Sequence, residues 1–393
     1  MPINWPSSSD ITEQLPIKGQ ASLYTGYTRQ TLIRKFRKEA PEAYLAVYEL
    51  LKNADFRMSG SVLVRENGFG FIPVLLALAL PRKAFTVSVW SVDSLETLNT
   101  NIGVNALGNR IKVVVEGVDS NQSSDVAILV HENYQSHDTV AHEVNQLIKR
   151  SKAGIVYIIT HKNKGVEKLV QTFQDTLHLR LDIIGRGNGG GRVIKVTRTQ
   201  SSNADQPNAL TRFFDALSQI NFLSGLSLFS AGSVDKGSEM LIRYVLDTTR
   251  QNQVNKIYDL ACGYGAIGLS LATKFPEAFV VLSDSNARAV DVAKRNAADG
   301  NLESRTSVIL SDGTQNVRGI FDLVVSNPPL HIERRKLTEI LINAGKLVKK
   351  GGRMLLVIED SQVDVVKDLV GSRLGYLKEV KRSKDHVILE YKK

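Results

Sequence analysis

Short apolar runs alternate with amphipathic stretches through the second half of the chain. The runs have strand length and lie at Lys256–Leu260, Phe279–Ser283, Ser307–Leu310, Phe321–Ser326 and Arg353–Ile358. Between them, Ala287–Ala298 and Arg335–Lys349 repeat apolar residues at helical spacing. This alternation predicts an α/β fold, in which helices cover both faces of a parallel sheet.

The two halves of the chain repeat each other at an offset of 195 residues, since Gly263 corresponds to Gly68 (263 − 68 = 195). The register runs without a gap from about residue 63 to residue 134, and it also matches Asn101 with Asn296 and Arg110 with Arg305. Apolar patterning alone is a poor explanation for such a match, so we expect a duplication. The chain is predicted to form two tandem Rossmann-like domains, 1–198 and 210–393, joined by a polar linker at 199–209.

Charge and cysteine content narrow the class of protein. Among 393 residues, 50 Lys and Arg outnumber 40 Asp and Glu, giving a net charge of +10 that favours an anionic partner such as nucleic acid. A merely soluble basic protein would have the same balance. The single Cys262 excludes an intramolecular disulfide, and His131, His137 and His142 lack zinc-site spacing, so no metal is expected.

The chain carries no pattern typical of export or membrane insertion. Its start, MPINWPSSSD, has no basic-then-apolar signal, and the longest apolar stretch, 69–80, is too short to span a bilayer. We therefore expect a cytoplasmic protein without a membrane partner. The sequence pattern indicates no particular oligomeric state.

A glycine-rich turn follows the first strand of the second half, in IYDLACGYGAIGLSLA from Ile257. Its glycines let the backbone approach a ligand, and the following helix offers free N–H groups to an anion, such as the methionine carboxylate of S-adenosylmethionine. A dinucleotide site or a plain tight turn has the same pattern. The predicted cofactor contacts here are Asp259, Ala261, Cys262, Gly263 and Gly265.

Two further acids follow the next two strands. Asp284, with Ser285 beside it, can accept hydrogen bonds from ribose hydroxyls, although a helix cap also suits an aspartate there. Asp312 can accept from an adenine amino group, or it can be an ordinary turn residue before Gly313. Both acids favour a nucleoside cofactor without choosing which one.

The strand FDLVVS ends in Asn327, Pro328, Pro329 and Leu330, which are the predicted catalytic residues. The prolines remove backbone donors and stiffen the chain. Asn327 is also a predicted cofactor neighbour. Its side-chain carbonyl and the Pro328 backbone carbonyl can both accept hydrogen bonds from one planar NH₂ group. They would hold that nitrogen in line with a sulfonium methyl. The alternative is an ordinary proline turn after a strand. The glycine-rich turn, Asp284 and Asp312, which all follow earlier strands, argue against this alternative.

The glycine-rich turn and NPPL resemble the class I S-adenosylmethionine-dependent methyltransferases that modify exocyclic or amide nitrogens. More narrowly, FSAGSVDKGSEMLI (229–242), DLACGYGAIGLSLA, DSNARAV and SNPPLH resemble the ribosomal RNA guanine-N2 methyltransferases of the small-subunit type. The resemblance implies a degenerate methyltransferase-like domain at 1–198, which supports the protein or binds RNA, and a catalytic domain at 210–393. It also implies S-adenosylmethionine as cofactor and ribosomal RNA or the small ribosomal subunit as partner.

The resemblance further implies that Asp235 and Gly237 help to close the cofactor pocket. The family mostly has phenylalanine after NPP, whereas this chain has Leu330, which offers apolar contact without a π face. Methylation of a protein glutamine or of adenine N6 by the same chemistry therefore stays open. Just beyond, Arg334, Arg335 and Lys336 can grip RNA phosphates, or they can form a solvated helix start.

A non-catalytic RNA-binding protein is the remaining alternative, and it predicts that both halves have lost their site. The second half keeps its polar groups. At the offset of 195, however, Asp259, Asp284 and Asp312 correspond to Val64, Val89 and Gly117, and Asn327–Pro329 corresponds to 132–134. We therefore expect one cofactor per chain. The glycines of GRGNGGGR (185–192) precede a strand rather than follow one, so we interpret them as a turn.

Overall fold

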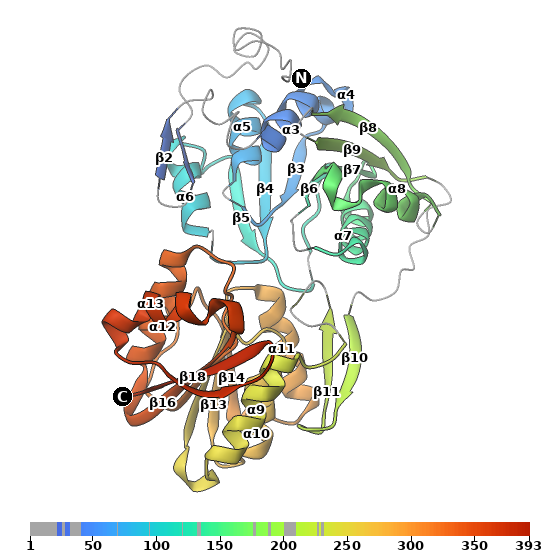
Figure 1. The fold of residues 1–393 in the computed structure, drawn as a ribbon. Coiled ribbons are helices and arrows are strands. Elements are labelled where there is room, and N and C mark those ends of the chain that lie inside the picture. Colours follow the sequence, from blue (N-terminus) through green and yellow to red (C-terminus); the bar gives the residue numbers. More distant parts are fainter. Residues whose placement is uncertain are drawn as a thin grey trace. The chain divides into compact units, whose positions relative to one another are not determined.

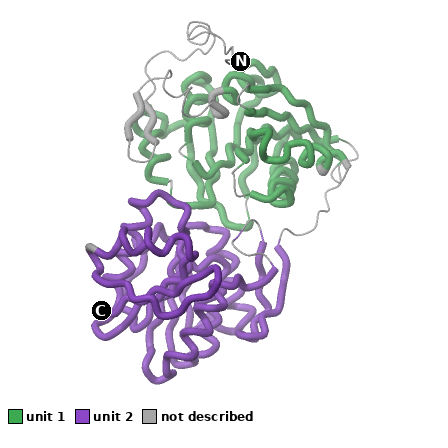
Figure 2. Tube along the Cα trace, in the orientation of Figure 1, with its two compact units in different colours: residues 1–209 green, residues 210–393 purple. Residues whose placement is uncertain are grey.

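The computed structural model describes residues 22–25, 28–31, 41–68, 70–93, 95–119, 121–131, 135–175, 178–187, 190–199, 210–225, 228 and 232–393. The chain divides into two compact units, Met1–Ala209 and Leu210–Lys393 (Figure 2). Apart from Thr199, the predicted linker lies outside the described residues. None of the described helices combines the length and the apolar character needed to cross a membrane.

The second unit is built on a seven-stranded sheet of order β14-β13-β12-β15-β16-β18-β17 (Figure 1). Five strands are parallel, and β18 runs antiparallel to both of its neighbours. The strands are β12 (Lys256–Leu260), β13 (Phe279–Asp284), β14 (Thr306–Leu310), β15 (Phe321–Ser326), β16 (Val348–Glu359), β17 (Lys378–Arg382) and β18 (His386–Lys392). The strands predicted from the apolar runs are confirmed to within one residue, except that β16 begins five residues earlier, at Val348 rather than Arg353 (353 − 348 = 5). The predicted helix Arg335–Lys349 was therefore wrong at its end, because the helix ends at Lys346 and Val348 already belongs to β16.

Helices cover both faces of this sheet, as the alternation predicts. Those on one face, α9, α10 and α11, contact the strands β12, β13, β14 and β16, whereas α12 and α13 pack together on the other face (Figure 1). A hairpin of β10 (Leu210–Asp215) and β11 (Ile220–Gly225) precedes α9. The helices are α9 (Lys236–Thr248), η2 (Gln251–Gln253), α10 (Ala266–Lys274), α11 (Ala287–Asp299), η3 (Glu303–Arg305), α12 (Arg334–Lys346), η4 (Asp360–Gln362) and α13 (Val363–Leu374).

The first unit has the same topology, with the strand order β5-β4-β3-β6-β7-β9-β8. Its strands are β3 (Ser61–Arg65), β4 (Ala84–Val89), β5 (Ile111–Val115), β6 (Val126–Val130), β7 (Ile155–His161), β8 (Arg180–Arg186) and β9 (Gly191–Thr197), with a separate hairpin of β1 (Ser22–Thr25) and β2 (Thr28–Thr31). Its helices are α3 (Pro41–Lys52), α4 (Ala54–Met58), α5 (Phe71–Ala79), α6 (Leu95–Val104), α7 (His137–Arg150), η1 (Lys162–Lys164) and α8 (Val166–Asp175).

The register between the two units is not gapless, which corrects the sequence-based alignment. The offset of 195 holds for the first three strands of each sheet. In the fourth strand, Val62 pairs with Val126, whereas its counterpart Ile257 pairs with Leu323, so the offset there is 197 (323 − 126 = 197). Between the third strand and the paired positions of the fourth, the second unit therefore has two more residues than the first unit.

An aspartate just before or within this fourth strand supports the corrected register. The Asp125 carboxylate accepts from Gly60 N and Ser61 N at 2.7 and 2.8 Å. In the second unit, the Asp322 carboxylate accepts in the same way from two backbone N–H groups at the start of β12, at 2.9 and 3.0 Å. Asn327 therefore corresponds to Val130 and Pro328 to His131, and the expected match of Asn327 with Glu132 was wrong.

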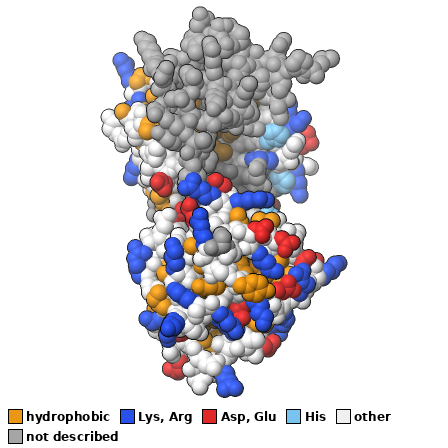
Figure 3. Space-filling view, turned by 60° about the vertical axis from the view of Figure 1, so that its left-hand side comes forward, with side chains coloured by type: hydrophobic (Ala, Val, Ile, Leu, Met, Phe, Trp, Pro, Cys, Tyr) orange, Lys and Arg blue, Asp and Glu red, His pale blue; other side chains and the backbone are white. Residues whose placement is uncertain are grey.

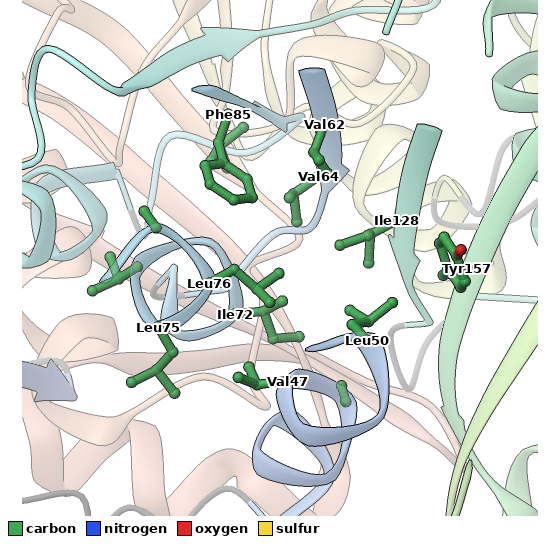
Figure 4. Packing of buried hydrophobic residues seen from close by; sticks show 14 of the residues in the cluster. Val47, Leu50, Val62, Val64, Ile72, Leu75, Leu76, Phe85, Ile128 and Tyr157 are labelled. Carbon is green, nitrogen blue, oxygen red and sulfur yellow. The ribbon is translucent and has the colours of Figure 1, made fainter. Parts of the chain in front are cut away.

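The core of the first unit fills the position of a predicted cofactor ligand. Val64, the counterpart of Asp259, is fully buried and points toward Ile72 and Leu76 of α5 (Figure 4). Burying a valine side chain contributes roughly 1.5–3 kcal/mol to folding. In the first unit this position thus serves packing rather than polar chemistry.

Candidate functional site

The predicted site residues of the second unit gather at the carboxyl ends of β12, β13, β14 and β15. In an open parallel sheet, this edge is where ligands bind, at the point where the strand order reverses. That point lies between β12 and β15, because the chain continues to β13 on one side and to β15 on the other.

The turn after β12 is held in a left-handed conformation. The φ angles of Ala261, Gly263 and Gly265 are 58°, 56° and 94°. A Cβ on Gly265 would lie 2.7 Å from a methyl carbon of Leu269, so both backbone conformation and space require glycine there. Gly265 is the N-cap of α10, so the helix begins at Ala266, directly after the glycine-rich turn.

Asp259 is fully buried beneath this turn. Its Oδ2 accepts from Gly268 N at 2.7 Å, whereas its Oδ1 has no hydrogen-bond partner among the described residues. Burial, together with the charge of Asp284, raises the Asp259 pKa to about 8. A buried carboxylate oxygen without a donor suits a cationic or N–H-bearing ligand, such as the amino group of a bound methionine moiety.

Asp284 connects the turn to the next strand. Its Oδ2 accepts from Gly263 N at 2.9 Å, and its Oδ1 accepts from Asn286 N at 2.9 Å. Asn286, not Asp284, is the N-cap of α11, because its side chain accepts from Arg288 N. The helix-cap alternative for Asp284 is therefore wrong, and Asp284 lies at the carboxyl end of β13, beside Ser285.

Asn327 is oriented by two residues at the start of α9. Its Nδ2 lies 3.2 Å from both Asp235 Oδ1 and Ser238 Oγ. A carboxylate can only accept, so the amide nitrogen faces Asp235 and the side-chain oxygen faces away. Asp235 also caps α9 by accepting from Ser238 N at 2.9 Å. Ser238 was not predicted from the sequence, although it directly follows the predicted Gly237 and lies three positions after Asp235.

The chain is held by a hydrogen bond and by burial where it leaves β15. Ser326 Oγ donates to Leu260 O at 2.7 Å in the buried edge, and Pro328 is buried while Pro329 is exposed. Leu330 is partly buried and packs against the apolar core between the sheet and α12. Leu330 is therefore a packing residue at least in part.

Gly237 lies against His386, the first residue of β18. A Cβ on Gly237 would be 2.9 Å from the His386 ring and 3.1 Å from Asp235 Oδ1. His386 was not predicted from the sequence, because it lies 59 residues beyond Asn327 with no motif around it (386 − 327 = 59). Gly237 thus keeps the start of α9 close to the far end of the sheet.

The three predicted phosphate-binding residues have different surroundings. Lys336 Nζ lies 3.1 Å from the Asp312 carboxylate, and both are about one-fifth exposed. Arg335 pairs with Glu339 one turn along α12, at 3.2 Å, and Arg334 is exposed. Charges of both signs are interspersed over this unit, which is the lower part of the view in Figure 3. A single-sign patch therefore does not mark the face in view.

An aromatic cluster attaches the hairpin of β10 and β11 to the glycine-rich turn. The ring of Tyr264 lies 5.9 Å from Phe213 and 5.5 Å from Phe222, edge to face. Fully buried Asn296 donates to Tyr264 O and Leu223 O and accepts from Leu223 N. The sequence held a signal for Asn296, since it is one of the residues matched between the two halves.

The Cys262 thiol is buried in the glycine-rich turn. Burial and the charges of Asp284 and Asp259 raise its pKa well above the usual range. The thiolate, which is the nucleophilic form of cysteine, is therefore disfavoured.

The corresponding edge of the first unit lacks these polar groups. Val64 and Val89 replace Asp259 and Asp284, and both are buried. Pro73 is the counterpart of Gly268, whose backbone N–H donates to Asp259 in the second unit (268 − 195 = 73). The first unit therefore lacks this N–H donor as well as the carboxylate that would accept from it. The edge instead holds a buried ion network, in which Arg65 pairs with Glu116 at 2.8 Å and with Glu143.

Residues 219–390 match the family model of the methyltransferase small domain. The match begins just before β11 and ends within β18, so it lies entirely in the second unit. Ribosomal RNA small subunit methyltransferase C of Pasteurella multocida is 33% identical to this chain over 145 residues, which are 36% of the chain and 42% of that relative. Its counterpart in Pseudomonas putida is 26% identical over 233 residues, which are 57% of the chain and 67% of the relative. The first match thus spans less than half of the relative's length.

The fold of the whole chain is similar to that of the T. thermophilus 16S rRNA N2 methyltransferase, solved in complex with AdoMet and guanosine. The TM-score is 0.75 at 19% identity, covering 97% of this chain and 99% of that one. The predicted fold, two tandem Rossmann-like domains of the class I methyltransferase type, is confirmed. The second of the two domains is the one that matches the methyltransferase small domain model.

Proposed function

We propose that this chain transfers a methyl group from S-adenosylmethionine to the exocyclic N2 of a guanine in small-subunit ribosomal RNA. The observation that carries this proposal is the orientation of Asn327. Its amide nitrogen is occupied by Asp235 and Ser238, which leaves the side-chain oxygen as an acceptor. An acceptor beside a backbone carbonyl of a proline suits a planar NH₂ donor.

The methyltransferase small domain and the similarity to ribosomal RNA small subunit methyltransferase C support the same activity. Bound S-adenosylmethionine would supply an electrophilic methyl group. We expect Asp259 Oδ1 to hold its amino group, the α10 N-terminus its carboxylate, Asp284 its ribose and Asp312 its adenine. The orphaned Asp259 oxygen fits this assignment, because a bound ammonium would supply the missing donor.

In this mechanism the residues of the chain act by positioning. Asn327 and the Pro328 carbonyl accept the two hydrogens of the acceptor amine and aim its lone pair at the methyl group. Asp235 and Ser238 keep the Asn327 amide from rotating. Such positioning needs no strong base, and the product nitrogen can lose its extra proton to these acceptors or to water. A guanine amine would have to leave its stack to reach the site.

The decisive experiment is mass spectrometry of ribosomal RNA nucleosides from cells with and without the protein. We expect one N2-methylguanosine to be lost from small-subunit RNA and restored by the wild-type gene but not by Asn327→Ala. An unchanged N2-methylguanosine content, with loss of an N6-methyladenosine or of a methylated protein glutamine, would overturn the guanine assignment. Loss of no methylated species would overturn the enzymatic one.

A further inference from the structure

Two arginines of the first unit stand directly opposite each other on neighbouring strands. Arg186, the last residue of β8, is the register partner of Arg192 in the antiparallel strand β9. Side chains that are opposite in such a pair project from the same face, with Cβ atoms roughly 4.5–5.5 Å apart. Two like charges at this distance destabilise the sheet, so the presence of two arginines at these positions requires an explanation.

More cationic groups surround the end of this hairpin. Lys162, just after β7, donates its backbone N–H to Gly190 O at 2.8 Å. The Lys162 side chain and the His161 ring both lie close to Gly190. A Cβ added to Gly190 would be 3.1 Å from Lys162 Cγ and 2.4 Å from the His161 ring. Three cationic side chains and a histidine therefore share one end of the β7–β9–β8 edge.

The three cations are not neutralised by any acidic side chain in the part of the chain that the structure describes. Within the described ranges, Lys162, Arg186 and Arg192 take part in no ion pair. Arg192 Nη1 instead donates to Gly191 O at 2.8 Å and to Gly187 O at 3.4 Å, which fixes the guanidinium over the turn. Neighbouring cations on the same two strands behave differently, since Arg180 pairs with Asp182 and Lys195 with Asp55.

We propose that Lys162, Arg186 and Arg192 form a phosphate-binding site for the backbone of the substrate RNA. Guanidinium forks bind phosphate oxygens bidentately, and an anion between the two arginines would turn their repulsion into attraction. This inference rests on the proposed RNA substrate, and it concerns RNA affinity rather than the chemistry of methyl transfer.

The test is filter binding of in-vitro-transcribed 16S ribosomal RNA to the full-length chain, without cofactor, between about 50 and 200 mM salt. The variant is Arg186→Gln/Arg192→Gln. The matched control is Arg180→Gln/Lys152→Gln, which removes the same charge from two residues that are paired with acids, Asp182 and Asp125. We expect the variant to bind at least about tenfold more weakly and its log–log salt slope to fall by about 1.4–1.8, or 0.7–0.9 per contact.

The thermal midpoint of the same variant separates a binding defect from a folding defect. Because the substitution removes a repulsion between opposite residues, the midpoint should stay or rise. RNA affinity and slope equal to those of the control, with RNA binding by the wild type intact, would overturn the site. Absence of RNA binding by the wild type would overturn it as well. Intact RNA binding without methyl transfer would instead contradict only the proposed function.

Discussion

The Asn327 side-chain nitrogen lies 3.2 Å from the carboxylate of Asp235, so the residue that follows β15 is oriented by the residue that caps α9. These two residues are 92 positions apart in the sequence, and the contact joins the part of the site assigned to the acceptor amine to the part assigned to the cofactor. The orientation of one amide therefore depends on how α9 begins.

Asn327→Ala should lower kcat for methyl transfer by about a hundredfold or more, because it removes a positioning contact. Cofactor affinity should change little, since Asn327 is assigned chiefly to the acceptor amine. Single-turnover kinetics and titration calorimetry measure the two quantities. Ser238→Ala should have a smaller effect of the same kind, about 2–10-fold on kcat, and Ser238→Thr should restore it. A variant of Asn327 that keeps more than about a tenth of wild-type kcat contradicts the assignment.

Asn327→Asp should make the reaction depend on pH in a way that the wild type does not. The new carboxyl group would face the Asp235 carboxylate, and like charges raise a carboxyl pKa. Its protonated form can donate to Asp235 and accept through its carbonyl oxygen, as the amide does. Activity should therefore be present at low pH and decline as pH rises through the raised pKa. A flat pH–rate profile for this variant would show that Asp235 does not orient residue 327.

Cofactor binding near pH 7 should release a proton from Asp259. Burial, with the charge of Asp284, raises the pKa of this carboxyl group to about 8, so it is mostly protonated in the free protein. A bound ammonium would favour the ionised form and lower that pKa. Affinity for S-adenosylmethionine should thus rise with pH up to about 8. Calorimetry in buffers of different ionisation enthalpy should detect most of one proton, and a buffer-independent enthalpy would argue against the contact.

Arg334 and Lys336 should respond differently to substitution. Arg334 is exposed, so Arg334→Ala should flatten the log–log salt slope of RNA binding by about 0.7–0.9 if it contacts one phosphate. Lys336→Ala should leave that slope unchanged, because its ammonium is paired with Asp312. It should instead alter cofactor affinity through the freed Asp312 carboxylate. Equal changes of the salt slope in the two variants would show that Lys336 also contacts an RNA phosphate.

The full chain should bind one molecule of S-adenosylmethionine. The first unit would bury ribose hydroxyls against Val89 without an acceptor, at about 1–3 kcal/mol for each unpaired group. Asp284→Ala should therefore abolish detectable binding at micromolar concentrations rather than expose a weaker second site. Calorimetric stoichiometry near two in the wild type, or saturable binding that survives in the variant, would mean that the first unit has kept a site.

The sequence predicted the strands well because each apolar run is bounded by glycine, proline or charged residues. It also located the polar groups at the carboxyl ends of the strands, where parallel topology brings them together. The register between the repeats was misjudged for a physical reason. Side chains alternate between the two faces of a strand with a period of two, so a shift of two residues preserves every inward and outward position. The shift is revealed by contacts in the fold, namely the backbone pairing of Ile257 with Leu323 and the matching contacts of Asp125 and Asp322.

The sequence pattern could not predict contacts between residues that are far apart in the chain. Nothing in the sequence near Asn327 indicates Ser238, and an aspartate before glycine at Asp312 gives no sign of pairing with Lys336. Sequence spacing describes what neighbouring residues share, whereas these contacts depend on how α9 and α12 pack against the sheet. The roles assigned to the site residues remain predictions, because the geometry describes their contacts and not their ligands.

The joint replacement of Asp259 by Val64 and of Gly268 by Pro73 makes the loss in the first unit hard to reverse. Restoring an aspartate at 64 alone would place a carboxylate in an apolar core, opposite a residue that has no N–H to donate. Restoring a glycine at 73 alone would supply a donor with no acceptor and weaken a buried helix. Either single step lowers stability, so evolution back to a working site would have to pass through a less stable protein. The first unit is thus free to diverge toward other uses while its fold stays fixed.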